Sequence, residues 1–362
     1  MGDGTFKYVP SLFVQQYGIH ISIGSKAIPV MIIFCESKTT SLYRAIFKYL
    51  KNEINVNITK FICDFEKAVH ISYKETYPKG ELSCCWFHYS QSIIKRVKKI
   101  VLSREYNSNK KVNLIIRKYL SLPFIHVDEI ENFHLIILNS IDDIEDEQIK
   151  IKMKLFDDYF QRTWFEKYPK TDWCQFDDIP LRTNNWSENF HSVYAQMFRR
   201  CHPNIFIAIE KIVDVMVQYE YQYNDLLLNP TKYVITEMNS LTIELLYIMN
   251  SKDTLYRNEP EKYLLALATA NIRLLLRIEK QILTCQGINN NRIKEIDQML
   301  ESKKELSLLE SEEEGNNLDK EKRHLETITK FHLKKQLQYL NGLVENNQGL
   351  YKFAMSFLPK HL

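Results

Sequence analysis

Three acidic residues have the type and the local setting that metal-dependent chemistry requires. Asp3 starts an Asp-Gly-Thr-Phe stretch, Asp64 follows a short apolar segment, and Glu188 lies in a polar segment rich in asparagine. Two divalent cations about 3.5–4 Å apart can activate an attacking oxygen and stabilise the leaving oxygen at a phosphodiester. Mg²⁺ prefers oxygen ligands and needs only one or two protein carboxylates beside substrate phosphates. An Asp/Asp/Glu set therefore suffices for phosphodiester chemistry if the fold brings the three residues together.

The segments around the first two acids are typical of strands that alternate with helices. Residues 5–23 carry β-branched and aromatic side chains at roughly alternate positions, and a nearly continuous apolar run at 27–35 follows a turn. From residue 41 the apolar spacing becomes helical. The order β-β-β-α-β-α-β-α predicts an α/β fold with a mixed sheet covered by helices, in which functional residues collect at strand ends. The later elements are expected at 56–63, 66–77, 82–87 and 88–101, and Asp64 falls between the first two of these.

A helical segment separates these elements from Glu188. Residues 104–181 have helical periodicity at 112–120, 128–141 and 147–164, with no evident run of strands. Glu188 is expected on a helix that begins near Asn184, on the same side as Asn185 and Asn189. Polar groups would then converge on one side of that helix while its apolar residues face the core.

Several further motifs occur in a set order around the three acids. They are Pro10, the strand Phe13–His20, Val30, Tyr43, Asp64-Phe65-Glu66, Cys85-Trp86-Phe87-His88, and Thr183-Asn184-Asn185 with Glu188. Together with the Asp-Gly-Thr-Phe stretch, this series resembles the transposase domain of Mutator-like elements. The resemblance covers roughly residues 3–200, and its strength lies in the order of the motifs rather than in any one of them.

The resemblance implies an RNase H-like catalytic core of the Asp/Asp/Glu type. Asp3, Asp64 and Glu188 would take the three acidic positions and bind two Mg²⁺ or Mn²⁺ ions. Because only two residues precede Asp3, we expect a clipped first strand whose end is frayed. The core would comprise residues 1–103 and 182–225, with an all-helical insertion at 104–181. A helical C-terminal region at 226–362, with a charged linker near 305–323, lies beyond the resemblance.

The resemblance also implies that a cysteine and a histidine near the second acid position DNA. Cys85 and His88 match this feature, although the residues alone favour a buried thiol and a hydrogen-bonded core histidine. The cysteine and histidine spacings do not fit a standard structural zinc site, and the scattered cysteines predict reduced thiols. The other candidates for positioning DNA are Asn184, Asn185, Lys95, Arg96, Arg199 and Arg200.

The overall charge is mild, so nucleic-acid affinity would have to come from local patches. The net charge is +3 over 362 residues, and 45% of the residues are hydrophobic. Apolar runs stay well short of the roughly 20 residues that span a bilayer. Basic clusters flank the proposed site at Lys95, Arg96, Lys98 and Lys99, at Lys110, Lys111, Arg117 and Lys118, and at Arg199 and Arg200.

These observations predict a DNA transposase catalytic domain that performs two-metal phosphodiester hydrolysis and strand transfer. The alternative is a transposase-derived DNA- or protein-binding protein that has lost catalysis, which the clipped first strand favours. A glycosidase, which also uses a carboxylate pair, lacks the expected barrel organisation here. The expected partners are DNA at transposon ends and target, a second copy of the chain, and a DNA-recognition module or full-length transposase acting in trans. Nuclear localisation is expected from the DNA substrate.

Overall fold

The computed structural model describes residues 1–6, 8–23, 26–100, 103–176, 185–198, 201–229 and 259–270. Within these ranges the chain is mixed α/β, and helices outnumber strands. The chain divides into two compact units. The first unit contains the strands β1–β5 and the helices α1, α2, α9 and α10, and the second contains α3 to α8 and α13.

An antiparallel sheet of three strands forms the centre of the first unit. Its strands are β1 (Gly2–Thr5), β2 (Gln15–Ile23) and β3 (Lys26–Cys35), in that order across the sheet. Asp3 pairs with Gly18 of β2, which in turn pairs with Ile32 of β3. Residues paired across an antiparallel ladder project to the same face, so Asp3 lies on the face that carries Gly18 and Ile32.

A second, parallel pair of strands follows in the chain. It comprises β4 (Lys60–Cys63) and β5 (Glu81–Cys84). The strand and helix order up to α3 is the predicted one, but within the described residues the strands form two sheets rather than one mixed sheet. β4 contacts β1 without joining its ladder. Both strands are only four residues long, which limits the backbone hydrogen bonds that could join them.

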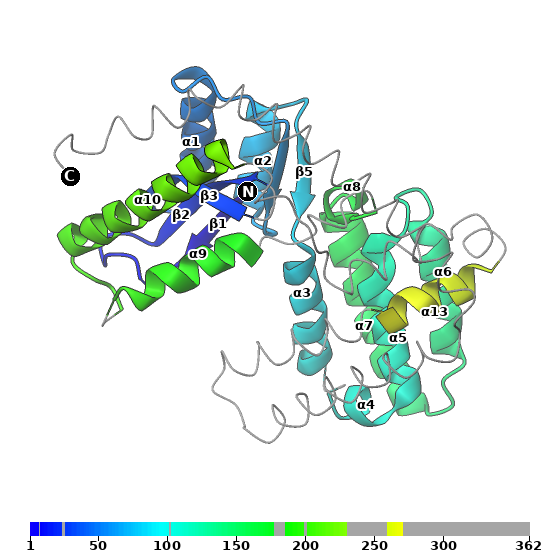
Figure 1. The fold of residues 1–362 in the computed structure, drawn as a ribbon. Coiled ribbons are helices and arrows are strands. Elements are labelled where there is room, and N and C mark those ends of the chain that lie inside the picture. The colour runs from blue at the N-terminus through cyan, green and yellow to red at the C-terminus, as the bar shows by residue number, and fades with distance from the viewer. Residues whose placement is uncertain are drawn as a thin grey trace, which may run out of the picture. The chain divides into compact units, whose positions relative to one another are not determined.

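Helices cover both faces of the three-stranded sheet (Figure 1). One face packs against α1 (Thr40–Asn52), which lies beside α2 (Lys67–Thr76). The other face packs against α9 (Asn185–Gln196) and α10 (Ile205–Leu228). The core on the α1 side is apolar and aromatic, and its largest members are Tyr17, Tyr43, Phe47, Phe61 and Tyr73.

Two glycines explain how β1 fits tightly between its neighbours. Gly2 and Gly4 alternate with Asp3, so they lie on the α1 side of the sheet. A Cβ at Gly4 would lie 2.6 Å from Oε1 of Gln15, and one at Gly2 would overlap the Tyr17 hydroxyl. Because β1 is fully paired and Asp3 is only 7% exposed, the expectation of a frayed first strand is wrong.

The second unit is helical in its described part. It contains α3 (Trp86–Lys99), α4 (Ser103–Ser108), α5 (Lys110–Ser121), a 3₁₀ turn (Leu122–Phe124), α6 (Ile130–Asp142), α7 (Glu147–Phe160), a π-helical turn (Gln161–Lys167), α8 (Lys170–Trp173) and α13 (Pro260–Ala270). The three helices predicted between Asp64 and Glu188 are therefore present. The unit begins at Trp86, so α3 belongs to it, whereas the sequence predicted an insertion from residue 104.

A buried polar cluster joins three helices of this unit. Asp157 of α7 accepts hydrogen bonds of 2.6 Å from the Tyr119 hydroxyl, from Gln161 Nε2 and from His134 Nε2. Burial alone would raise the pKa of Asp157, but these hydrogen bonds lower it below its ordinary value. The cluster fixes α5, α6 and α7 together, since a buried carboxylate is tolerated only when it is hydrogen-bonded.

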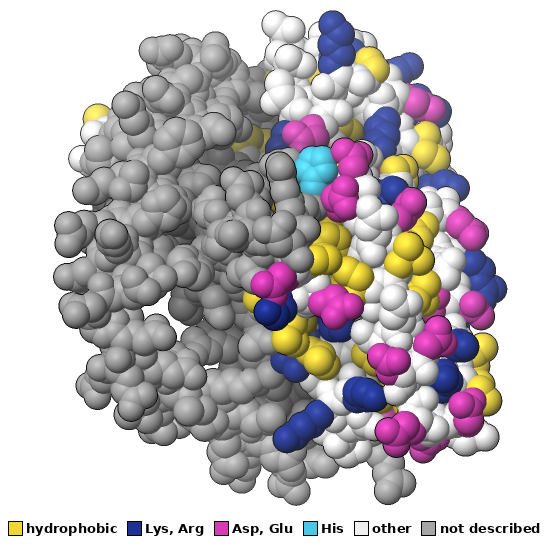
Figure 2. All heavy atoms as spheres, turned by 90° about the vertical axis from the view of Figure 1, so that its right-hand side faces the viewer, with side chains coloured by type: hydrophobic (Ala, Val, Ile, Leu, Met, Phe, Trp, Pro, Cys, Tyr) yellow, Lys and Arg dark blue, Asp and Glu magenta, His cyan; other side chains and the backbone are white. Residues whose placement is uncertain are grey.

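Charges of both signs are interspersed on the described part of the face in Figure 2. No helix in the described residues is long and apolar enough to span a membrane. Much of the C-terminal region falls outside the described residues, including the predicted linker near 305–323. Within the region predicted to be helical at 226–362, the structure describes the end of α10 and the helix α13.

Candidate functional site

Asp3 is held in the middle of β1 by neighbours on two elements. Its Oδ1 accepts a hydrogen bond of 2.8 Å from the backbone N–H of Gly4. Its Oδ2 lies 3.5 Å from Nε2 of His191, on the helix α9 that covers this face of the sheet. The Asp3 side chain is 9% exposed and that of His191 is 12% exposed. The carboxylate is therefore hydrogen-bonded within its own strand and lies close to the helix that covers it.

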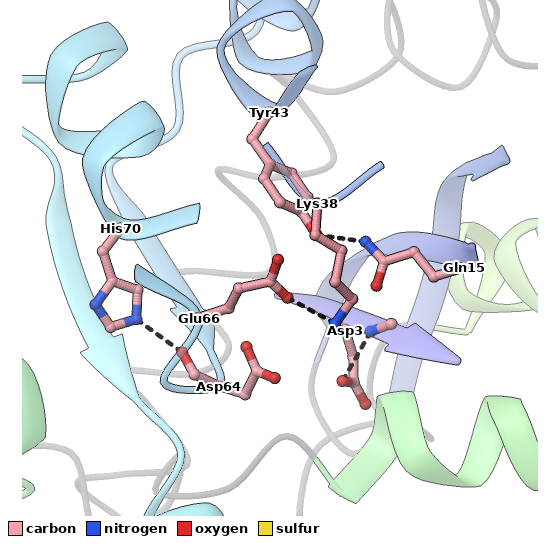
Figure 3. A network of polar contacts seen from close by, with 8 residues as sticks. Asp3, Gln15, Lys38, Tyr43, Asp64, Glu66 and His70 are labelled. Atoms are coloured by element: carbon pink, nitrogen blue, oxygen red, sulfur yellow. Dashed lines mark hydrogen bonds and ion pairs between the residues drawn. The ribbon is translucent and has the colours of Figure 1, made fainter. Parts of the chain in front are cut away.

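Asp64 is the first residue after β4, where the chain turns toward α2 (Figure 3). Its backbone carbonyl accepts a hydrogen bond of 2.7 Å from Nε2 of His70, one turn into α2. Because a carbonyl can only accept, Nε2 of His70 carries the proton. This bond ties the strand end to the helix and sets the direction in which the Asp64 side chain leaves the backbone.

The charge of Asp64 is strongly affected by its surroundings. Burial, together with the negative charges of Asp3 and Glu66, raises the pKa of Asp64 to about 7. Lys38 acts in the opposite direction. Figure 3 shows the Asp3 and Asp64 side chains in the same region, beside Glu66. The predicted pair Asp3 and Asp64 is thus brought together from two different sheets.

Glu66 and Lys38 form the outer side of this acidic group. Nζ of Lys38 lies 3.4 Å from Oε2 of Glu66 and 4.1 Å from the centre of the Phe6 ring. Gln15 donates through Nε2 to the Tyr43 hydroxyl, and burial together with a hydrogen bond to Glu66 raises the pKa of Tyr43 well above its ordinary value. A polar network therefore runs from β2 through α1 to the carboxylates (Figure 3).

The third predicted acid, Glu188, lies in the first turn of α9, but its side chain falls outside the described residues. His191 follows it by three positions, and residues three apart are neighbours on a helix surface. The contact between His191 and Asp3 shows that α9 lies against β1 in this region. Sequence reasoning missed His191, although its spacing from Glu188 was the available signal.

The residues predicted to position DNA are spread over both units. Cys85 follows β5 in the first unit, and its thiol is fully buried. His88, Lys95 and Arg96 lie on α3 in the second unit, where Lys95 donates to Gln91 and Arg96 stacks 4.8 Å above the Tyr159 ring. Asn184, Arg199, Arg200 and the side chain of Asn185 fall outside the described residues.

Four residues of the candidate site were not predicted from the sequence: Lys38, Glu66, His70 and His191. Glu66 was visible as part of the Asp64-Phe65-Glu66 motif, but nothing in the sequence showed that its carboxylate would pair with Lys38. Lys38 comes from the loop between β3 and α1, far from any motif. Such residues reach the site through tertiary packing, which residue spacing along the chain does not encode.

The donor set at this site suits a hard divalent cation. Asp3 and Asp64 supply carboxylate oxygens, the ligands that Mg²⁺ and Mn²⁺ prefer. Their mutual repulsion, expressed in the raised pKa of Asp64, would be relieved by a cation. Among side chains that the structure describes, a set that leaves out Glu188, no group of three His, Cys, Asp or Glu residues has metal-binding geometry.

Comparison with known proteins identified no relative of this chain. No family model, curated protein or solved structure matches the chain.

Proposed function

We propose that this chain is the catalytic domain of a DNA transposase of the Mutator-like type, with an RNase H-like core. The observation that carries the proposal is the convergence of Asp3 and Asp64. Asp3 lies within β1 and Asp64 directly follows β4, two strands of separate sheets, and the charge of Asp3 contributes to the raised pKa of Asp64. Burying two acids side by side is costly unless a cation or a proton is shared between them.

In this proposal Asp3, Asp64 and Glu188 would hold two Mg²⁺ or Mn²⁺ ions. When bound, these ions would lower the pKa of an attacking hydroxyl and offset the negative charge that builds on the phosphate. The support for Glu188 is that α9 packs on β1 through His191, one turn along the helix. His70 would fix the Asp64 backbone, and His191 would hold the Asp3 carboxylate in place.

The reaction proposed is hydrolysis followed by strand transfer. Water attacks the phosphorus atom, the P–O bond to the 3′ oxygen breaks, and a free 3′-hydroxyl is released. That hydroxyl then attacks a phosphodiester of the target DNA and displaces a second 3′-hydroxyl. The partners are accordingly transposon-end and target DNA and a second copy of the chain, with a recognition module or full-length transposase in trans, and the site of action is the nucleus.

The test is a plasmid nicking assay on the full chain with Mn²⁺ or Mg²⁺ as the added ion. We expect metal-dependent nicking by the wild type, and its loss in Asp64→Asn and Glu188→Gln. Glu75→Gln is the matched control, because Glu75 lies on α2 but its carboxylate pairs with Arg44 at the surface. Equal activity in all variants would reject the site.

The alternative, a derivative that binds DNA or protein without catalysis, makes a different prediction. It requires DNA binding without nicking under every metal condition, and no dependence of that binding on Asp64 or Glu188. The well-ordered pairing of β1 and the burial of Asp3 remove the main sequence argument in its favour.

A further inference from the structure

Lys38 is a basic residue beside the acidic group. It lies in the loop between β3 and α1, and its side chain is 37% exposed. Its Nζ lies 3.4 Å from Oε2 of Glu66, two residues after Asp64. In Figure 3 it extends from its loop toward the carboxylates of Asp3, Asp64 and Glu66.

The contacts of Lys38 hold its ammonium at this place without enclosing it. Nζ lies 4.1 Å from the Phe6 ring centre, and this ring is half exposed, so the stem is supported on one side only. The Glu66 contact is 3.4 Å long. A partly exposed ion pair of this length contributes little to stability. The small contribution of this ion pair to stability therefore does not explain why a lysine occupies position 38.

The chemistry of the site gives a stronger reason. DNA that enters an acidic site meets repulsion between its phosphates and the carboxylates. A lysine is a compact point charge that binds phosphate oxygens without demanding a fixed geometry. An ammonium at the rim of the acidic pair can exchange its carboxylate partner for a phosphate oxygen when DNA binds.

We infer that Lys38 contacts a DNA backbone phosphate next to the reacting phosphodiester, with Glu66 as its partner while the site is free of DNA. This assigns Lys38 a positioning role for the substrate. The inference rests on the proposed function, because it needs DNA at this site.

The experiment measures the salt dependence of DNA binding by the full chain. Fluorescence anisotropy with a labelled duplex, in Ca²⁺ buffer between about 50 and 200 mM salt, gives the slope of log K against log salt concentration. Each phosphate contact contributes roughly 0.9 to this slope. We expect Lys38→Gln to weaken DNA binding several-fold and to lower the slope by roughly 0.9, the contribution of one phosphate contact. Lys38→Arg should restore both the affinity and the slope.

Lys60→Gln is the matched control. Lys60 also belongs to the first unit and pairs with a glutamate, Glu81 at 2.8 Å, but it starts β4 whereas Asp64 follows its end. The Lys60→Gln variant should have the same slope as the wild type. An equal fall in slope for both variants would show a general charge effect and overturn the assignment of Lys38.

A double-mutant cycle separates a phosphate contact from mere neutralisation of Glu66. If Lys38 contacts DNA, Lys38→Gln reduces the slope in a Glu66→Gln background as well. If Lys38 only offsets the charge of Glu66, its loss has no effect there, and the inference fails. Thermal unfolding of each variant confirms that it is folded.

The outcomes also separate this inference from the proposed function. If the wild type binds DNA and Lys38→Gln binds it with the same slope, the role of Lys38 is rejected and the transposase proposal is unaffected. Absence of any DNA binding by the wild type rejects both.

Discussion

Nε2 of His191 lies 3.5 Å from Oδ2 of Asp3, and this contact joins the helix α9 to the first strand of the sheet. The two residues come from different segments of the first unit, 1–85 and 183–237. Phe190, the preceding residue, packs edge-to-face on His20 of β2 with ring centres 5.0 Å apart. The start of α9 is therefore anchored at two points on the sheet face that carries Asp3, and this is the turn in which Glu188 lies.

The contact predicts a supporting role for His191. His191→Ala should lower metal-dependent nicking about 10- to 100-fold, the range typical of residues that orient a metal ligand. His191→Gln, which can still donate from a side-chain nitrogen, should recover part of that loss. Nicking rates at saturating Mn²⁺ test this, and thermal unfolding checks the fold. Unchanged rates in His191→Ala would show that the contact is dispensable.

Asp64 makes stability depend on pH in an unusual direction. Its pKa in the folded chain is about 7, against an ordinary value of 3.8, so the folded state holds the proton more tightly than the unfolded state. Its contribution to stability is then present below about pH 4 and is lost as the pH rises through about 7. Asp64→Asn should therefore stabilise the metal-free chain at about pH 8, by roughly 1–3 kcal/mol once partial exposure is allowed for.

Urea unfolding in EDTA at about pH 5 and pH 8 measures this effect. The gain from Asp64→Asn should shrink markedly at the lower pH, where Asp64 is mostly protonated. Glu75→Gln, which removes a carboxylate exposed at the surface, serves as the control and should not show this pH dependence. A loss of stability in Asp64→Asn at the higher pH would contradict the repulsion between the buried acids.

Divalent cations should offset the repulsion between the carboxylates of Asp3 and Asp64. At about 100 times its dissociation constant, a bound ion stabilises the folded state by about 2.7 kcal/mol. We expect Mg²⁺ and Mn²⁺ to raise the thermal midpoint of the wild type at neutral pH or above, and to have little effect on Asp3→Asn or Asp64→Asn. Equal shifts in wild type and variants would mean that the ions bind elsewhere.

The sequence predicted local elements well because their signals are local. Thr39 caps α1 by accepting from the N–H of Leu42, and the helical apolar spacing begins close to that residue. Helical spacing does not by itself determine which side chains of α1 are buried. Tyr43 and Phe47 pack in the core, whereas Tyr49, which fits the helical period equally well, is 41% exposed. Which aromatic residues face inward depends on the sheet they meet.

The site was predictable only where residues carry a motif. Asp3 lies in β1 and Asp64 directly follows β4, and their joint role in a metal site stays a prediction. Lys38 and His70 belong to the same site because β3, α1 and α2 deliver them there, and no spacing along the chain indicates that. The division of the strands into two sheets was equally hidden, since it depends on pairing between segments distant in sequence.

The buried carboxylate Asp157 should matter for folding rather than for the proposed chemistry. Asp157→Ala would leave the Tyr119 hydroxyl and Nε2 of His134 without their acceptor in the core of the second unit. Removing one member of such a buried network costs about 3–5 kcal/mol. Asp158→Ala is the matched control, because the adjacent Asp158 side chain is exposed. Urea unfolding should show a large loss for the first variant and little for the second; similar losses in both would mean that the network adds nothing beyond the helix itself.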